Sequence, residues 1–456
     1  MSAILIRGCD AVVTMDDAGT ELSRGSLLLR DGVIAWVGRD DAPGAPEVGD
    51  TEVIDGAGMV AIPGLINAHH HLYQSLTRVR AQGQGLFGWL RELYPVWAGL
   101  TVDWMRAAAG AGLAELALSG CSTTTDHHYV FPNGVTGVLD AEVDVARELG
   151  LRFHPCRGSM DLGRSDGGLP PDAIVEDTDD ILGHTEDAVR RLHDPSPGSM
   201  LRVAVAPCSP FSATRRLMEE SQALARRLGV RLHTHIAETL DEERFCRESF
   251  GLRPVELLDA LGWLGPDVWL AHCVHLNADD VGRIARTKTS VAWCPTSNLR
   301  LGSGLAPARE LLDAGAVVGL AVDGSASNDS GDMLAEVRQA MLVARGRSGP
   351  AAMSARDALR VATRGSAGCL GRDDIGSLQV GKRADVALFD LANLAYAGAE
   401  ADPVAALVYC RPQRASYLFV EGRPVVRDGE LVTADEGEIG RAARRLGRTI
   451  ASEGRR

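Results

Sequence analysis

Six side chains that bind metals or carry protons stand at or just beyond the ends of short apolar runs: His69, His71, His235, Glu238, His272 and Asp323. Such runs predict buried strands. Imidazoles and carboxylates at strand ends can converge on one ion in the mouth of a barrel. A divalent ion held there would make hydroxide from water at neutral pH. The sequence therefore predicts a hydrolytic metal centre.

The first run ends in a histidine triplet. Alternate side chains of a strand share a face, so His69 and His71 can point at one ion while His70 points away. Two ligands from one strand must share a face, because zinc lies only about 2.1 Å from each nitrogen. A surface triplet is the alternative, and the preceding apolar strand argues against it.

The other candidates end later runs. His235 is the third proposed nitrogen ligand, and Glu238 follows where the chain leaves the strand and can bring a carboxylate above the metal. His233 shares the parity of His235 but lies deeper, which favours a core or supporting role. His272 and Asp323 could each be structural when considered alone, Asp323 as a turn or cap residue. Their places at equivalent strand ends favour the site.

One ion is favoured over two. Two-metal relatives of such barrels usually need a bridging carboxylate, often a carbamylated lysine. The chain has two lysines, Lys288 and Lys382, of which one precedes a strand and the other lies outside the barrel. A nitrogen-rich ligand set favours Zn²⁺, with Fe²⁺ as the alternative.

The middle of the chain alternates strand-like and helical patterns. The predicted strands are residues 59–66, 121–126, 151–156, 201–206, 230–235, 268–272, 290–294 and 317–322. The clearest predicted helices are residues 103–118, 135–149, 213–228, 331–344 and 354–370. This alternation predicts an α/β fold with a (β/α)8 barrel. A doubly wound open sheet is the alternative, weakened because no G-x-G-x-x-G follows a strand.

Both ends of the chain are rich in short strands. These are residues 3–7, 26–29, 33–37, 384–389, 415–420 and 424–426, with Asp31-Gly32 as a hairpin turn. We expect a small β-sandwich built from both termini. The predicted division is residues 1–57 and 376–456 for the sandwich and tail, and 58–375 for the barrel.

The composition of the chain excludes several classes of binding partner. The net charge of −14 argues against a nucleic-acid backbone. Nine scattered cysteines without a C-x-x-C pair, and no secretory leader, predict reduced thiols in the cytoplasm. No run of about 18 apolar residues predicts a membrane span. We expect a small heterocyclic substrate, no membrane or nucleic-acid partner, and a homo-oligomer.

Candidate substrate contacts lie on segments that follow the first four barrel strands. They are Gln74, Trp89, Tyr94, Trp97, His128, Arg157 and Cys208. The aromatic segment from Phe87 to Trp97 could stack on a flat ring or close over it as a lid. Core packing is the alternative for its tryptophans, and a structural role is the alternative for Gln74 and Arg157. Of His127 and His128, one should point inward.

The complete pattern resembles the amidohydrolase superfamily, in the branch of cytosine- and guanine-deaminase-like and triazine-hydrolase-like enzymes. Four segments are similar to bacterial 8-oxoguanine deaminases: HHHLYQSLTR at 69–78, LFGWL at 86–90, FPNG at 131–134 and GSASND at 324–329. The resemblance covers nearly the whole chain, including the split β domain. It implies that the metal is bound by His69, His71, His235 and Asp323. It also implies that Glu238 and His272 handle protons.

The resemblance implies hydrolytic deamination of 8-oxoguanine to urate and ammonia. Isoxanthopterin or guanine deamination, and triazine amino- or chlorohydrolysis, remain alternatives, since the same metal machinery could serve them all. A non-catalytic binding barrel is disfavoured by the intact set of proton-handling residues. The zinc deaminases of another fold carry H-x-E and P-C-x-x-C, which Pro207-Cys208-Ser209-Pro210 does not match.

Overall fold

A computed structural model describes residues 3–47, 49 and 51–453 of the chain. Within residues 51–453, eight parallel strands stand side by side in chain order: β6 (Leu65–Asn67), β7 (Cys121–His128), β8 (Arg152–Ser159), β9 (Ala204–Pro207), β10 (Leu232–Ile236), β11 (Val268–His272), β12 (Ser290–Trp293) and β13 (Val318–Leu320). The N–H of Ala68, directly after β6, donates to the carbonyl of Leu320 in β13 at 3.0 Å. This bond joins the first strand to the last, so the predicted barrel is confirmed over the open sheet.

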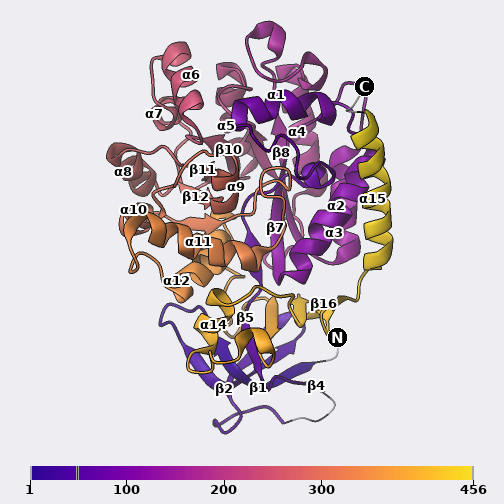
Figure 1. The fold of residues 1–456 in the computed structure, drawn as a ribbon, viewed down its shortest axis with the longest axis vertical. Helices are drawn as coiled ribbons and strands as arrows, with labels where there is room; N and C mark the ends of the chain where they lie inside the picture. Colours follow the sequence, from indigo (N-terminus) through magenta and orange to yellow (C-terminus); the bar gives the residue numbers. More distant parts are fainter. Residues whose placement is uncertain (1–2, 48, 50, 454–456) are drawn as a thin grey trace.

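Helices cover the outside of the barrel (Figure 1). They are α1 (Leu86–Trp97), α2 (Val102–Leu118), α3 (Val138–Leu149), α4 (Thr178–Leu192), α5 (Arg215–Leu228), α6 (Leu240–Phe250), α7 (Pro254–Ala260), α8 (Ala278–Thr287), α9 (Pro295–Arg300), α10 (Ala308–Asp313), α11 (Met333–Ser348), α12 (Ala355–Arg360) and α13 (Ser366–Cys369). The predicted helices appear as α2, α3, α5, α11 and the run α12–α13, which a π turn at Val361–Gly365 joins. In the described ranges, no helix combines the length and the apolarity that crossing a membrane requires.

Local sequence sets the ends of these helices. The side chain of Thr101 accepts a hydrogen bond from the N–H of Trp104 at the start of α2, and Thr214 does the same for Leu217 in α5. α5 ends at Gly229, which adopts the left-handed conformation at φ 68°. After Gly229 only Val230 and Arg231 precede β10, so this cap sets where that strand begins.

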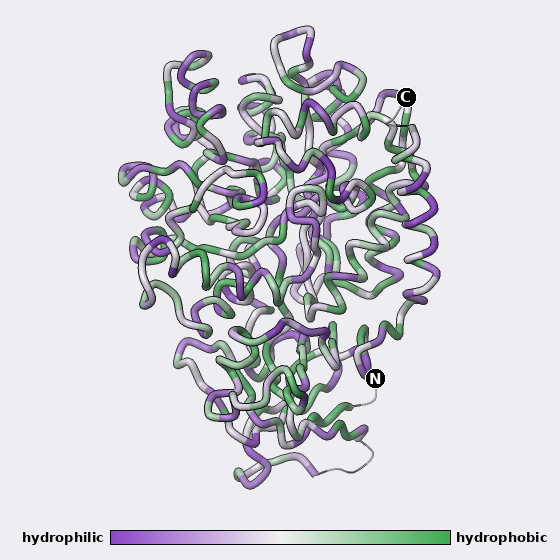
Figure 2. The backbone as a smooth tube through the Cα atoms, viewed as in Figure 1, coloured by the Kyte–Doolittle hydropathy of each residue, from purple (hydrophilic) through white to green (hydrophobic). Residues whose placement is uncertain are grey.

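The two ends of the chain build a second sheet, at the bottom of Figure 1. Across the described residues its strands are β1 (Ile4–Val13), β2 (Glu21–Arg30), β3 (Val33–Arg39), β4 (Glu52–Asp55), β5 (Met59–Pro63), β14 (Val386–Asp390), β15 (Tyr417–Val420), β16 (Arg423–Arg427) and β17 (Glu430–Leu431). They form one continuous mixed sheet from both termini, and Figure 2 shows its strands as largely hydrophobic. The predicted turn is present, because Asp31 and Gly32 both have positive φ, 52° and 77°.

The strand predicted at residues 59–66 is two strands in two different sheets. β5 pairs with β1 and β14 in the terminal sheet, whereas β6 pairs with β7 in the barrel. Gly64 lies between them, and a Cβ there would come within 2.4 Å of the Ser122 Oγ. The bare glycine backbone therefore lets the chain pass from one sheet to the other without a loop.

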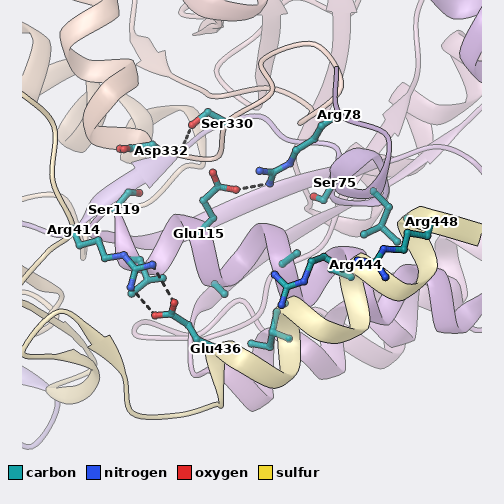
Figure 3. A pocket seen from close by; sticks show the side chains of 18 of the residues that line it. Ser75, Arg78, Glu115, Ser119, Ser330, Asp332, Arg414, Glu436, Arg444 and Arg448 are labelled. Carbon is teal, nitrogen blue, oxygen red and sulfur yellow. Dashed lines mark hydrogen bonds and ion pairs between the residues drawn. The ribbon is translucent and has the colours of Figure 1, made fainter. Parts of the chain in front are cut away.

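The C-terminal segment returns to the barrel. After α14 (Pro403–Tyr409) and the last strands, α15 (Glu436–Glu453) runs along α2 (Figure 1). A groove of about 810 Å³ lies beside these helices, and Figure 3 shows Arg78 paired with Glu115 and Arg414 paired with Glu436 in its lining. α15 therefore packs against a barrel helix, whereas β5 is a strand of the terminal sheet. The division at residues 57/58 and 375/376 stays a prediction.

A buried ion pair joins the lower end of the barrel to the terminal sheet. Arg152, at the start of β8, is 1% exposed and donates to both oxygens of Asp385 at 3.1 Å. It also donates to the carbonyl of Ser199 at 2.7 Å and contacts Glu421. A guanidinium buried to this degree must keep its acceptors, because an unpaired buried charge is strongly destabilising.

Replacing Arg152 with methionine should lower the free energy of unfolding by about 3–5 kcal/mol, because Asp385 would stay buried without its cation. Denaturant unfolding of the full chain measures this loss. The matched control is Arg191→Met, which removes a half-exposed pair with Asp140 at 2.9 Å and should cost at most about 1 kcal/mol. Equal losses in the two variants would contradict a special role for the buried pair.

Candidate metal centre

The carboxyl ends of four barrel strands bring together the predicted ligands and His272, which was predicted to handle protons. His69 and His71 follow β6, His235 belongs to β10, His272 ends β11 and Asp323 follows β13. All five side chains are buried. The N–H of Asp323 donates to the carbonyl of His69 at 3.2 Å, which ties the two strand ends directly.

The ligand atoms crowd around one point. The Nε2 atoms of His71 and His235 are 3.0 Å apart. The Asp323 Oδ1 lies 3.4 Å from the His69 Nε2 and 3.3 Å from the His71 Nε2. These separations fit ligands of one ion, since two atoms each about 2.1 Å from zinc are at most about 4.2 Å apart.

Hydrogen bonds at the far nitrogens assign the tautomers of these rings. The His71 Nδ1 donates to the carbonyl of His127 at 2.8 Å, and the His235 Nδ1 donates to the carbonyl of Cys208 at 2.7 Å. A carbonyl only accepts, so both Nδ1 atoms carry the proton and both Nε2 atoms carry a lone pair.

His69 reaches the same state through a second histidine. The His233 Nδ1 donates to the carbonyl of Trp269 at 2.8 Å, so the His233 Nε2 is an acceptor. It lies 2.7 Å from the His69 Nδ1, which therefore donates to it. The His69 Nε2 is left as a buried lone pair without a hydrogen-bond partner in the described part of the chain. His233 thus supports a ligand, as its deeper position in the strand suggested.

A cation fits this arrangement. Three lone pairs and a carboxylate face one another at 3.0–3.4 Å with no proton between them, which is repulsive without a positive charge. Burial lowers the pKa of His71 to about 3, and it also lowers the pKa of His69 and His235, so the rings are neutral at pH 7 as metal ligands must be. The residues His69, His71, His235 and Asp323 could therefore hold one divalent ion.

The chain bends sharply where these side chains leave their strands. Ala237, His272 and Asp323 have φ angles of 53°, 71° and 63°, in the left-handed region that residues other than glycine seldom adopt. Such a conformation costs of the order of 1–3 kcal/mol and clusters at functional sites. The carboxylate of Glu242 secures one bend by accepting from the N–H groups of Ala237 and Glu238, each at 2.8 Å.

Glu238 lies at the side of the centre. Its Oε1 accepts from the Ser303 Oγ at 3.2 Å, and its Oε2 is 3.6 Å from the His272 Nε2. Burial raises the pKa of Glu238 well above its ordinary value, and the negative charges of Asp323 and Glu242 raise it further. Both effects favour the protonated form of the carboxyl group, the form that can donate a proton.

His272 and Asp323 complete the group with opposite properties. The His272 Nδ1 accepts from the Asn298 amide at 3.0 Å, so the neutral ring presents Nε2–H as a donor. Burial lowers the pKa of His272 to about 3. Burial by itself would raise the pKa of Asp323, but the surrounding histidines hold it well below its ordinary value. Its Oδ2 accepts from the Ser297 Oγ at 2.6 Å.

A small cavity adjoins these groups. About 30 Å³ is free, roughly the space of one water molecule. The lining comprises His71, Gln74, Leu86, Trp89, Leu90, Tyr94, Tyr129, Cys208, Phe211, His235, Glu238, His272, Leu301, Asp323 and Ser327. The helix α1 contributes four of these side chains, so a ligand larger than water requires this wall to move.

The expected substrate contacts divide into two sets. Gln74, Trp89, Tyr94 and Cys208 line the cavity. Trp97 lies in the core, where its Nε1 donates to the Thr77 Oγ1 at 3.1 Å.

His128 and Arg157 also lie outside the cavity. The His128 Nε2 donates to the carbonyl of Val130 at 2.9 Å, and its ring faces Glu142. Arg157 donates to Glu176 at 2.7 Å and stacks on the ring of Phe131. The inward member of the histidine pair is His127, whose ring stacks on His235 with centroids 4.7 Å apart.

Several lining residues were not predicted. Tyr129 could have been found, because it shares the parity of Thr125 and His127 on β7 and therefore the same face. The other unpredicted lining residues come from helices and loops over the barrel mouth, and the local sequence does not predict where these segments run. They are Leu86, Leu90, Phe211, Leu301 and Ser327.

Comparison with known proteins agrees with this geometry. Residues 60–425 match the amidohydrolase family. The 8-oxoguanine deaminase of Pseudomonas aeruginosa is 46% identical over 438 residues, 95% of this chain and 96% of that protein. An isoxanthopterin deaminase from an unknown prokaryotic organism is 37% identical, over 90% of this chain and 89% of that protein. The crystal structure of an atrazine chlorohydrolase from Arthrobacter aurescens complexed with zinc has a TM-score of 0.92 and 37% identity, covering 97% of this chain and 100% of that chain.

Replacing His233 with leucine should weaken zinc binding about 10- to 100-fold, because His69 would lose the acceptor that fixes its tautomer. Competition with a chromophoric chelator measures the affinity. The matched control is His154→Leu, a buried histidine whose ring lies 5.8 Å from that of Trp269 and contacts no proposed ligand. An unchanged affinity in the His233 variant would show that the relay does not support the centre.

Proposed function

This chain belongs to the amidohydrolase family, and we propose that it deaminates an amino-substituted purine by hydrolysis, with 8-oxoguanine as substrate and urate and ammonia as products. One observation carries the proposal: a single small cavity is lined by His71 and His235, whose Nε2 atoms carry lone pairs, and by two carboxyl groups whose pKa values are shifted in opposite directions, that of Asp323 downward and that of Glu238 upward. The 46% identity to an 8-oxoguanine deaminase over nearly the whole chain supports the choice of substrate.

We propose that His69, His71, His235 and Asp323 bind one divalent ion in the barrel mouth. The bound ion would lower the pKa of water enough for attack at neutral pH. The nitrogen-rich set favours Zn²⁺, as does the zinc in the related atrazine chlorohydrolase, and Fe²⁺ is the alternative.

The chain's own residues account for the protons. Glu238 donates its proton to the ring nitrogen next to the amino-bearing carbon, which makes that carbon more electrophilic. Asp323 accepts a proton from the attacking water. His272 donates Nε2–H to the oxygen that develops negative charge on the same carbon. Asp323 then protonates the leaving amine, the C–N bond breaks and ammonia departs. The remaining hydroxyl proton returns to Glu238, which restores its carboxyl group and leaves a carbonyl on the ring.

The cavity beside the proposed metal centre is too small for a bicyclic substrate. A bicyclic purine does not fit in about 30 Å³, so we propose that α1 opens to admit it and then closes over it. The Trp89 Nε1 donates to the carbonyl of Ala326 at 3.1 Å, which ties α1 to the loop after β13 when the site is closed. Gln74 and Tyr94 bring polar groups to an otherwise largely apolar lining, and we propose that they orient the ring.

A substrate screen tests the proposed function. Ultraviolet absorbance should fall for 8-oxoguanine with stoichiometric release of ammonia, and kcat/KM should be highest for that base among 8-oxoguanine, guanine, isoxanthopterin and an amino- or chlorotriazine. Turnover of isoxanthopterin with inert 8-oxoguanine would overturn the substrate and leave the deaminase reaction in place. No turnover by the zinc-loaded protein would overturn both.

The variant Glu238→Gln should lower kcat about 100- to 10,000-fold while the zinc content stays unchanged, because the amide cannot give up a proton. The native rate should fall as pH rises through the raised pKa of Glu238, and the residual rate of the variant should lack this fall. Glu115→Gln, which changes a carboxylate in the α2 groove, is the control and should keep the native rate. A native rate for Glu238→Gln would exclude Glu238 as the acid.

A further inference from the structure

A second group of metal-binding side chains lies on the outer side of the barrel wall. Along β7, Asp126 and His128 point away from the barrel because His127 between them points inward. His70, between the proposed ligands His69 and His71, also points outward and approaches Gly112 of α2. Glu142 of α3 faces the same space. The side chains of His70, Asp126, His128 and Glu142 are all 0% exposed.

Most polar atoms of this group are unsatisfied. Among the described residues, neither ring nitrogen of His70 nor the His128 Nδ1 has a hydrogen-bond partner, and the side chains of Asp126 and Glu142 interact with each other rather than with a donor group. The satisfied atoms are the Asp126 Oδ1, which accepts from the N–H of Leu72 at 2.5 Å, and the His128 Nε2. Buried polar atoms nearly always have a partner, so this group points to something that fills the space between them.

The tautomer of His128 limits the kind of group that can fill this space. Its Nε2 donates to the carbonyl of Val130 at 2.9 Å, so its Nδ1 carries a bare lone pair. This Nδ1 is 3.7 Å from the Glu142 Oε2, and the His70 Nδ1 is 3.9 Å from the Asp126 Oδ1. Both separations are too long for hydrogen bonds and within the limit of about 4.2 Å for two atoms on one ion.

The charges of the Asp126 and Glu142 carboxyl groups also favour a cation in this space. No Arg or Lys pairs with Asp126 or Glu142 in the described structure, and two bare carboxylates cannot stay ionised together in a dry interior. Burial raises the pKa of Asp126 to about 7, and burial and the charge of Asp126 raise the pKa of Glu142. A shared proton would relieve the carboxylates, but it would leave the His70 and His128 nitrogens without partners. A divalent cation would neutralise both carboxylates and accept one lone pair each from His70 and His128.

We propose that His70, Asp126, His128 and Glu142 bind a second divalent metal ion in a structural site behind the barrel wall. Ligand atoms of Asp126, His128 and Glu142 lie within 4.8 Å of one another, so a small inward shift brings them to the limit of about 4.2 Å for one ion. His70 joins this group through Asp126, whose Oδ1 lies 3.9 Å from its Nδ1. Two imidazoles and two carboxylates suit Zn²⁺ or Mn²⁺. A four-ligand site with no solvent exposure has no open position for substrate, so the ion is structural.

Such an ion would act on the reaction centre through the backbone. It would link the segment after β6 to β7 and to α3, directly behind His69 and His71. Residue 70 and the two proposed ligands beside it share one short stretch of backbone, so clamping His70 would hold the neighbouring rings in place. The barrel mouth would still hold one ion, with the second on the far side of the strand.

Metal content of the full-length protein tests the site. The protein is dialysed against Zn²⁺ or Mn²⁺, desalted and measured by mass spectrometry of the metal per chain. We expect two ions in the native protein and one in Glu142→Gln and in His128→Asn. His71→Asn should also retain one ion, because it disrupts only the barrel-mouth site. His154→Asn, which replaces a buried histidine outside both groups, should retain two.

Two results would overturn the proposal. One ion in the native protein, unchanged in Glu142→Gln, would mean that a shared proton and water satisfy the buried group. Two ions in both the native protein and Glu142→Gln would place the second ion elsewhere. The native measurement needs no variant to fold, and substrate turnover enters neither outcome, so the test is independent of the proposed reaction.

Discussion

The barrel mouth depends on lone pairs that face one another. Backbone carbonyls of His127 and Cys208 take the Nδ1 protons of His71 and His235, and His233 takes the proton of His69. Each ring is thereby left with a bare Nε2. Those of His69 and His71 lie 3.4 and 3.3 Å from the Asp323 carboxylate, and that of His235 lies 3.0 Å from the His71 Nε2. The lone pairs and the carboxylate repel one another, so this arrangement destabilises the folded chain. A bound cation would make it favourable. The strained φ angles at His272 and Asp323 add to the same cost.

That cost must be offset by rigid packing elsewhere. The barrel interior below the histidines is filled by small buried residues and by Trp269, whose Nε1 donates to the carbonyl of Ala68 at 3.0 Å. At the opposite end, Arg152 links β8 to the terminal sheet through Asp385. The terminal sheet therefore closes the amino ends of the strands, away from the chemistry, and the carboxyl ends remain free to carry the site.

Much of this was predictable because strand periodicity is local. Side chains along a strand alternate between its two faces, which placed His69 and His71 on one face and His70 on the other. Apolar runs located each barrel strand to within a few residues. The same rule would have selected His127 over His128, had β7 been extended to residue 128. The split of residues 59–66 was not predictable from hydrophobicity, since both halves are apolar and differ in which sheet they join. Trp97 and Arg157 occupy segments near the mouth, but their partners, Thr77 and Glu176, are set by tertiary packing.

The two carboxyl groups at the centre illustrate how one cavity can support acid and base chemistry together. Glu238 and Asp323 are both fully enclosed, and burial pushes the pKa of each upward. A cation shared with the neighbouring histidines would favour the charge of Asp323, whereas the nearby carboxyl groups of Asp323 and Glu242 disfavour the charge of Glu238. The ionised residue therefore keeps its neighbour protonated, and the difference in pKa follows from their positions rather than from their chemistry. A reaction that removes a proton from water and adds one to a ring nitrogen needs both states at the same pH, and this pair of environments supplies them.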